Sequence, residues 1–258
     1  MARVIAVANQ KGGVGKTTTA INLAACLAAA EHSTLLVDVD PQANATTGVG
    51  LETRSIKSHV YHLLLREVVG PEIVLTTALP ALHVIPSRRE LVGAEVELVE
   101  LPDREQRLKQ GLQPLVSQYS YILIDCPPSL GFLTLNALVA ADTVLIPLQC
   151  EYYALEGLGQ ILETVRLCQQ TVNPHLVVEG ILLTMFDGRV NLASQVAAEV
   201  RHHFGERVFR TVIPRNVRLS EAPSHGKPVI LYDIRCAGAE GYLQLAREVI
   251  DGAKTRAG

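Results

Sequence analysis

The sequence predicts an α/β fold in which helices cover both faces of a mostly parallel, twisted sheet. Short apolar runs alternate repeatedly with helical patterns along the 258 residues, and continuous apolar runs are typical of parallel strands buried on both faces. A glycine-rich loop directly follows the first of these runs. With 48% hydrophobic residues the chain can bury a sizeable core. We find no linker, repeat or low-complexity segment, so we expect one domain over residues 1–258.

The first predicted strand, residues 4–8, feeds a loop that begins at Gln10. The loop ends in Gly-Lys-Thr, the end of the pattern G-x-x-x-x-G-K-[ST], although Gln10 stands where that pattern has glycine. Backbone N–H groups and the following helix dipole make such a turn a phosphate site. The predicted nucleotide-binding residues of the loop are Gly12, Gly13, Val14, Gly15, Lys16, Thr17 and Thr18. We expect a P-loop NTPase-like site for ATP and Mg²⁺, with Lys16 on the β- and γ-phosphates and Thr17 on the metal.

Carboxylates follow two of the predicted strands. A helix over residues 17–30 leads to a strand over 34–37, which ends in Asp38 and Asp40, and a strand over 121–124 ends in Asp125. Ligands bind at the carboxyl ends of strands in open α/β sheets, and a P-loop protein places its second Mg²⁺ contact on such a carboxylate. We therefore expect Asp125 to contact the metal, usually through water.

The remaining elements are predicted from apolar spacing and from Pro and Gly signals. The predicted helices span 58–66, 102–118, about 157–171, 191–204 with Leu192, Val196 and Val200 on one face, and a terminal stretch around 239–250. The predicted strands span 82–85, 144–148, 176–184 and 208–213. An acidic helical region over 90–100 is best explained as a solvated face.

Composition limits the functional class. The five cysteines form no C-x-x-C pair and fit small core residues of a reduced, intracellular protein. No apolar run approaches the ~18 residues of a membrane span, so we expect a soluble, cytoplasmic protein. The net charge is −3, but residues 185–258 carry 11 Lys and Arg against 8 Asp and Glu. The last third is therefore where a polyanion contact is expected.

Five motifs, taken in order, resemble one family over nearly the whole chain. They are residues 11–18 (KGGVGKTT), 38–42 (DVDPQ), 124–129 (IDCPPS), 151–157 (EYYALEG) and 213–224 (IPRNVRLSEAPS). They resemble the ParA/Soj chromosome-partitioning ATPases, which carry a deviant Walker A motif and belong with MinD and the nitrogenase iron protein. The resemblance implies a single deviant-Walker-A ATPase domain with the P-loop fold.

The resemblance also implies an ATP-dependent homodimer. In this family the signature lysine, here Lys11, reaches the nucleotide of the partner subunit, and Asp40 matches the residue that positions or activates the attacking water. Lys11, Lys16 and Asp40 are therefore the expected catalytic residues, and Asp38 is expected near the metal shell. A cation added in trans stabilises transition-state charge as an arginine finger does. The implied dimer-face residues are Lys11, Gly12, Asn44 and Glu151.

Further residues follow from the same resemblance. The segments that surround adenine match Met185, Pro214, Arg215 and Asn216. Arg189 and Arg218 match basic positions that bind double-stranded DNA without sequence preference, a salt-sensitive mode of binding. The implied cycle is closure of two chains on ATP, DNA binding on the nucleoid, and hydrolysis stimulated by a partner of the ParB/Spo0J type.

Three alternatives share the fold class. A membrane-associated MinD-like protein would need a terminal amphipathic helix with a cationic face, whereas residues 239–251 carry mixed charge. A cobyrinate or dethiobiotin synthetase would need further substrate residues, and we find no candidates for them. An iron protein would need cysteines that bridge a cluster between subunits, and Cys126 is better explained as a core residue.

Overall fold

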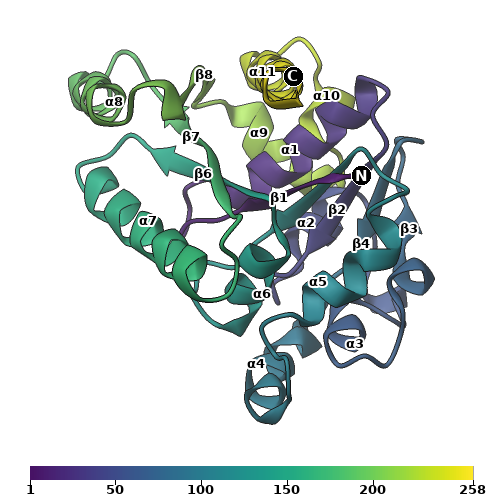
Figure 1. Ribbon diagram of the computed structural model, residues 1–258. Coiled ribbons are helices and arrows are strands. Elements are labelled where there is room, and N and C mark those ends of the chain that lie inside the picture. Colours follow the sequence, from purple (N-terminus) through teal and green to yellow (C-terminus); the bar gives the residue numbers. More distant parts are fainter. Residues whose placement is uncertain (258) are drawn as a thin grey trace.

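A computed structural model describes residues 1–257, with side chains described for residues 1–252. In this part of the chain, eight strands form one sheet in the order β3-β4-β2-β5-β1-β6-β7-β8 (Figure 1). They are β1 (Arg3–Val7), β2 (Thr34–Asp38), β3 (Leu75–Thr76), β4 (Leu82–Ile85), β5 (Tyr121–Asp125), β6 (Thr143–Gln149), β7 (Val177–Phe186) and β8 (Val208–Pro214). Every neighbouring pair is parallel except β3 and β4. The predicted mostly parallel sheet is confirmed, and the reading as one domain stays a prediction.

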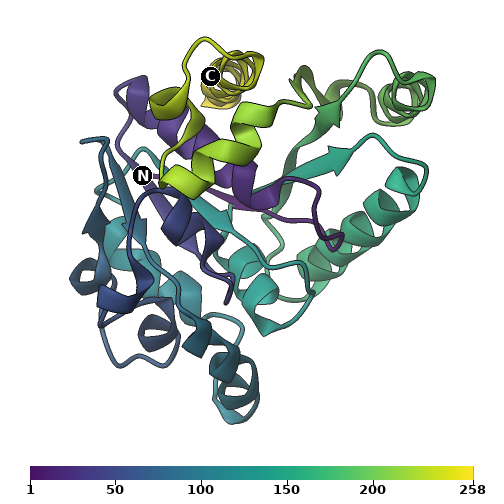
Figure 2. The ribbon, with the colours of Figure 1, turned by 180° about the vertical axis from the view of Figure 1, so that it is seen from behind.

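Helices cover both faces of this sheet, as predicted. They are α1 (Lys16–Ala29), α2 (Asn44–Gly48), α3 (Val60–Leu64), α4 (Ala94–Glu97), α5 (Arg107–Leu112), α6 (Phe132–Ala140), α7 (Ala154–Thr171), α8 (Asn191–Phe204), α9 (Val217–Glu221), α10 (Val229–Tyr232) and α11 (Ala237–Ala257). Figure 2 shows α9, α10 and α11 on the same side of the sheet as α1. Ile5 and Val7 of β1 join the core on that side, and Val4 and Ala6 join the core on the other. The period of two along a strand produces this division.

The register of the central strands brings the predicted carboxylates together. Asp125, at the end of β5, lies level with Val7 of β1 on one side and with Asp38 of β2 on the other. The glycine-rich loop leaves β1 at this same edge. The strand order of the sheet reverses at β1: β2 to β5 lie on one side of it and β6 to β8 on the other. Open α/β sheets bind ligands at such a switch point.

Two segments, one between β2 and β3 and one between β4 and β5, differ from the prediction. The helix predicted over 58–66 is the single turn α3, and the region over 90–100 forms short 3-10 turns on either side of α4. The helix predicted over 102–118 is only α5, followed by a 3-10 turn over 113–115. Asp103 has a left-handed φ of 53°, which stops a helix from starting there, and Pro114 cannot donate a helical hydrogen bond.

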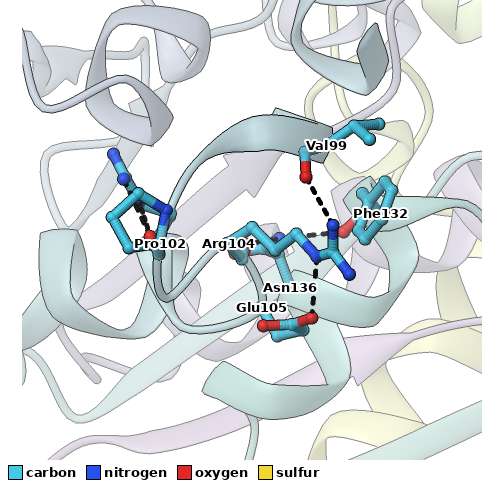
Figure 3. Close-up of polar contacts among 7 residues, drawn as sticks. Val99, Pro102, Arg104, Glu105, Phe132 and Asn136 are labelled. Atoms are coloured by element: carbon cyan, nitrogen blue, oxygen red, sulfur yellow. Dashed lines mark hydrogen bonds and ion pairs between the residues drawn. The ribbon is translucent and has the colours of Figure 1, made fainter. Parts of the chain in front are cut away.

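A polar cluster links the segment between β4 and β5 to α6, a helix that we did not predict (Figure 3). The Arg104 guanidinium lies over the Phe132 ring at 4.9 Å and donates to Glu105 at 3.0 Å and to the Val99 carbonyl. Asn136 Nδ2 donates to the Arg104 carbonyl at 2.7 Å. In the acidic region itself, the half-buried Glu95 accepts from the first N–H groups of α6. The expectation of a purely solvated acidic face is therefore wrong for Glu95, because its carboxylate caps a helix.

Other differences are smaller. The helix over 191–204 is confirmed as α8, but Leu192 is 42% exposed, and the buried face consists of Ala193, Val196, Ala197 and Val200. Strand β3 and helices α9 and α10 were also not predicted, because each is too short for a periodic signal. Four of the five cysteines are buried, and Cys236 is half-buried. Within residues 1–257, no helix combines the length and the apolar character that crossing a membrane requires.

Candidate active site

A hollow of about 780 Å³ opens at the carboxyl ends of the central strands. The predicted residues that line it are Gly12, Gly13, Gly15, Lys16, Thr17, Thr18, Asp40, Asn44, Met185, Pro214, Arg215 and Asn216. The structure thus brings together four segments that are far apart in the sequence: the glycine-rich loop, the residues after β2, the end of β7, and the end of β8 with the residues that follow it. The volume suits a small organic ligand.

The glycine-rich loop is held in place by polar contacts from two strands. Gly13 and Gly15 have φ values of 74° and 88°, which favour glycine. Val14 does not line the hollow, because it is buried and its carbonyl accepts from Thr184 Oγ1 of β7 at 2.8 Å. Asn9 Nδ2 donates to the carbonyl of Pro147 in β6 at 2.7 Å. The loop is therefore shaped before any ligand arrives.

Lys16 begins α1 and is only 7% exposed. Its Nζ donates to the Lys11 carbonyl at 3.0 Å. Burial lowers the pKa of Lys16, and the nearby Asp125 carboxylate opposes that shift. A buried ammonium at the end of a phosphate-type loop is a strong site for an anion, because little water screens its charge.

Asp125 is fully buried, and neither of its carboxylate oxygens has a hydrogen-bond partner of ordinary geometry among the described residues, although the Thr17 hydroxyl lies close enough to stabilise the charged form. Burial first and the neighbouring Asp38 charge second raise the pKa of Asp125 well above its usual range, while the Thr17 hydroxyl and Lys16 oppose the shift. Buried polar groups are normally paired, so these two oxygens fit ligands of a cation or of a water bound to a cation. The donor set, a carboxylate beside the Thr17 hydroxyl, suits Mg²⁺.

Asp38 is also fully buried, but its oxygens are occupied. Oδ2 accepts from the backbone N–H of Thr46 at 2.8 Å and from its hydroxyl at 2.7 Å, and Oδ1 accepts from Asp40 N at 3.1 Å. Burial raises the pKa of Asp38, and the Thr46 bonds oppose that shift. We predicted Asp38 near the metal shell. Because its oxygens are already bonded within the chain, Asp125 is the better candidate for the metal contact, and Asp38 lies beside it.

Asp40 lines the hollow and is 6% exposed. Its Oδ1 accepts from Gln42 N at 2.8 Å, and the other oxygen has no hydrogen bond among the described residues. Its carbonyl accepts from Ser87 Oγ at 2.7 Å and from Ala43 N at 2.9 Å. A fixed backbone with one carboxylate oxygen unengaged is suited to accepting a hydrogen bond from a water molecule.

The far wall of the hollow follows β7 and β8. Met185 has a left-handed φ of 49°, a strained conformation for a non-glycine residue. Arg215 N donates to the Phe186 carbonyl at 3.0 Å, and Asn216 Oδ1 caps α9 by accepting from Arg218 N at 3.0 Å. The predicted adenine segments therefore form one wall of the hollow.

Lys11 and Glu151, two of the predicted dimer-face residues, form an ion pair within the chain. Lys11 Nζ lies 2.9 Å from Glu151 Oε2, and the two side chains are 37% and 49% exposed. Neither residue lines the hollow. Gly12 and Asn44, the other two, do line it.

The predicted DNA-binding arginines lie outside the hollow and are both paired with carboxylates. The Arg189 side chain is 90% exposed and contacts both oxygens of Asp187, at 2.9 and 2.7 Å. Arg218, on α9, lies 2.8 Å from Glu221 and 3.4 Å from Asp233. Arg189 lies in the turn between β7 and α8, whereas Arg218 lies on α9.

Several residues of the hollow were not assigned a role from the sequence. They are Gln42, Pro128, Thr184, Ile213, Val217, Leu219, Ser220, Pro223 and Tyr242. Most of them lie within the motifs over 38–42, 124–129 and 213–224. Membership of these motifs was the signal from which a role in the site could have been predicted. Tyr242 was expected only to pack on the sheet, yet its hydroxyl also lies 3.1 Å from Thr19 Oγ1. Thr184 carried no signal beyond ending a strand.

Comparison with known proteins identifies the family. A family model described as an AAA domain matches residues 2–178. The chromosome partitioning protein ParA of Myxococcus xanthus is 59% identical over 248 residues, which cover 96% of this chain and 88% of that protein. The sporulation initiation inhibitor protein Soj of Bacillus subtilis is 57% identical, covering 96% of this chain and 98% of that protein. The chain belongs to the ParA/Soj family of ATPases.

Solved structures agree with this ParA/Soj assignment in fold. A protein described as cobyrinic acid a,c-diamide synthase from Mycobacterium smegmatis, solved with ADP and magnesium, has a TM-score of 0.87 at 36% identity, covering 98% of this chain and 96% of that one. The cell division ATPase MinD of Pyrococcus furiosus has a TM-score of 0.79 at 24% identity, covering 98% and 100%, and shows the fold alone. The P-loop fold predicted for this ParA/Soj chain is therefore confirmed.

Proposed function

We propose that this ParA/Soj ATPase is an ATP-driven DNA-partitioning switch, built as a single domain over residues 1–258. ATP with Mg²⁺ closes two chains into a homodimer, the dimer binds double-stranded DNA without sequence preference, and hydrolysis resets it. A partner of the ParB/Spo0J type stimulates that hydrolysis, and the protein works in the cytoplasm on the nucleoid. The observation that supports this most is that Lys16 and Asp40 line one hollow, while the buried Asp125 carboxylate, without a hydrogen-bond partner among the described residues, lies close enough to Lys16 to oppose the lowering of its pKa.

The glycine-rich loop binds the phosphates. Its backbone N–H groups donate hydrogen bonds to the β-phosphate, and the positive end of the α1 dipole favours the negative charge there. The buried ammonium of Lys16 contacts the β- and γ-phosphates. Thr17 and Asp125 would hold Mg²⁺, with the Asp38 carboxylate near Asp125 and outside direct contact with the metal. When bound, the metal supplies positive charge that neutralises the phosphates. Met185, Pro214, Arg215 and Asn216 enclose the adenine end.

Asp40 orients the attacking water. Its unengaged oxygen accepts a hydrogen bond from a water molecule placed in line with the γ-phosphate, while its backbone stays fixed. Lys11 of the partner subunit then adds a second cation beside the phosphates. Charge in the transition state is stabilised from both chains, so hydrolysis depends on dimerisation.

DNA binding uses arginine charge outside the hollow. Arg189 and Arg218 contact DNA phosphates. Each arginine must first leave its ion pair with a carboxylate of its own chain. The dimer presents two copies of each arginine, and binding through both copies raises its affinity for DNA. DNA therefore prefers the ATP-bound dimer.

A MinD-like membrane function is the second candidate, and α11 argues against it. Glu248 of α11 accepts from the N–H groups of Arg210 and Thr211 at 2.7 and 3.0 Å, so this part of the helix is docked on β8. Its polar face also carries both signs of charge. Anionic lipid favours a cationic face.

Co-sedimentation tests the proposal. DNA fragments of unrelated sequence are expected to carry the protein into the pellet only with Mg·ATP, and liposomes containing anionic lipid are not expected to carry it in flotation.

Lys16→Ala should lose both ATP binding and DNA binding. Asp40→Ala should stay on DNA, because the dimer cannot reset. Lys57→Ala, at an exposed lysine without an ion pair among the described residues, is the control. Equal DNA binding without nucleotide, or flotation with lipid, would contradict the proposal.

A further inference from the structure

Two buried hydroxyl residues, Thr46 and Ser87, connect Asp38 to the backbone of Asp40. Thr46 Oγ1 donates to Asp38 Oδ2 at 2.7 Å and accepts from Ser87 N at 2.9 Å. Ser87 Oγ then donates to the Asp40 carbonyl at 2.7 Å. Asp40 N closes the ring by donating to Asp38 Oδ1 at 3.1 Å.

The direction of each bond is fixed by chemistry. The carboxylate of Asp38 and the carbonyl of Asp40 can only accept, so both hydroxyl protons are committed to them. Thr46 and Ser87 are each 0% exposed. Water therefore cannot compete for these groups, and buried hydrogen bonds that are fully satisfied hold a unique geometry.

The strands explain why Ser87 can reach Asp40. Ile85, at the end of β4, lies level with Val37 of β2. Two residues further along, Ser87 stands beside the segment that carries Asp40. Neither Thr46 nor Ser87 lines the hollow that receives the nucleotide.

We infer that Thr46 and Ser87 are positioning residues for hydrolysis, which fix the Asp40 backbone so that its carboxylate meets the attacking water at the correct place. The inference rests on the proposed function, in which Asp40 orients that water. Neither residue touches the nucleotide, so they act on turnover rather than on ATP affinity. A misplacement of about 1 Å can lower a rate up to ~100-fold.

The decisive substitution is Ser87→Ala. It leaves the Ser87 N–H paired with Thr46 and the Asp40 carbonyl paired with Ala43, so the variant should fold. We expect kcat for ATP hydrolysis to fall about 10-fold, with KM for ATP unchanged within about two-fold. Ser55→Ala is the matched control, because Ser55 Oγ donates to the Glu52 carbonyl at 2.8 Å on the exposed surface. It should hydrolyse ATP at the parent rate.

A pair of substitutions at Thr46 separates the hydroxyl from packing. Thr46→Val keeps the shape and removes the hydroxyl, whereas Thr46→Ser keeps the hydroxyl and removes a methyl group. We expect kcat to fall in Thr46→Val and to be largely retained in Thr46→Ser. Equal losses in both variants would overturn the inference in favour of packing.

The outcomes also distinguish this inference from the proposed function. If Asp40→Ala is inactive while Ser87→Ala keeps the parent kcat, the inference that Ser87 positions Asp40 is wrong. The proposed role of Asp40 itself is then supported. If Asp40→Ala keeps the parent rate, the proposed role of Asp40 fails. A rise in KM that matches the fall in kcat/KM for Ser87→Ala would assign Ser87 to nucleotide binding and would also overturn positioning.

Discussion

The ammonium of Lys11 lies 2.9 Å from the carboxylate of Glu151 in the same chain. In the proposed dimer that ammonium belongs beside the nucleotide of the other subunit. It cannot do both, so the ion pair within the chain opposes closure. Both side chains are partly exposed, and pairs of this kind contribute about 0.2–1 kcal/mol.

We predict that Glu151→Gln strengthens ATP-dependent dimerisation by up to about five-fold, because it removes this competing partner. Sedimentation equilibrium with Mg·ATP, in an Asp40→Ala background that prevents turnover, measures the effect. Glu156→Gln is the control, since it removes the same charge from an exposed position on the same segment. A weaker dimer in Glu151→Gln would instead mean that Glu151 contributes attractive contacts to the interface.

Asp125→Asn should separate stability from metal binding. The substitution removes a buried carboxylate that lies beside Asp38 and has no hydrogen-bond partner among the described residues, so the nucleotide-free protein should melt at a higher temperature. The stabilisation given by Mg·ATP should shrink, because less metal binds and ligand stabilisation follows affinity. Thermal melting with ATP, with and without Mg²⁺, measures both effects. An undiminished Mg²⁺-dependent shift would exclude Asp125 from the metal site.

Arg218→Ala and Arg189→Ala should each weaken DNA binding and leave ATP-dependent dimerisation intact. Log K falls as log salt rises, and each lost phosphate contact makes this negative slope shallower by about 0.9. Binding measured across a salt series gives this slope, with Arg166→Ala as the control at an exposed arginine on α7. A parent-like slope for both variants would remove these arginines from the DNA contact.

His59 should make the free energy of unfolding fall at acid pH. The residue is 2% exposed, and burial first and His62 second lower its pKa from 6.5 to about 4, with Arg88 adding to the shift and Glu90 opposing it. Between these values the unfolded chain binds the proton and the folded chain does not. Stability is therefore complete above pH 6.5, and about 2 kcal/mol is lost by pH 5.

Urea unfolding of the parent and of His59→Gln at pH 7 and pH 5 checks this expectation. The raised pKa values of Asp38 and Asp125 act in the opposite direction, but they are common to both proteins and cancel in the difference. The parent should lose more stability than the variant on acidification. Equal losses would show that His59 does not cause the effect.

Much of the central architecture was predictable, because it depends on strong local signals. Continuous apolar runs marked the strands around β1, and the loop pattern marked the phosphate site at their edge. The long helices α7 and α8 had clear spacing. The segment between β4 and β5 was poorly predicted, since contacts such as Arg104 with Phe132 and Glu95 with α6 join residues about 30 positions apart or more.

The sequence by itself determined the fold class, the P-loop and the family, because each of these follows from residue types at short, fixed spacing. Only the tertiary structure decided that the Asp125 oxygens have no hydrogen-bond partner among the described residues while both Asp38 oxygens accept hydrogen bonds, although each aspartate ends a strand. It also decided that Lys11 meets Glu151 and that Ser87 holds Asp40. These relationships depend on which strands lie side by side, and strand order is a property of the whole chain rather than of any local segment.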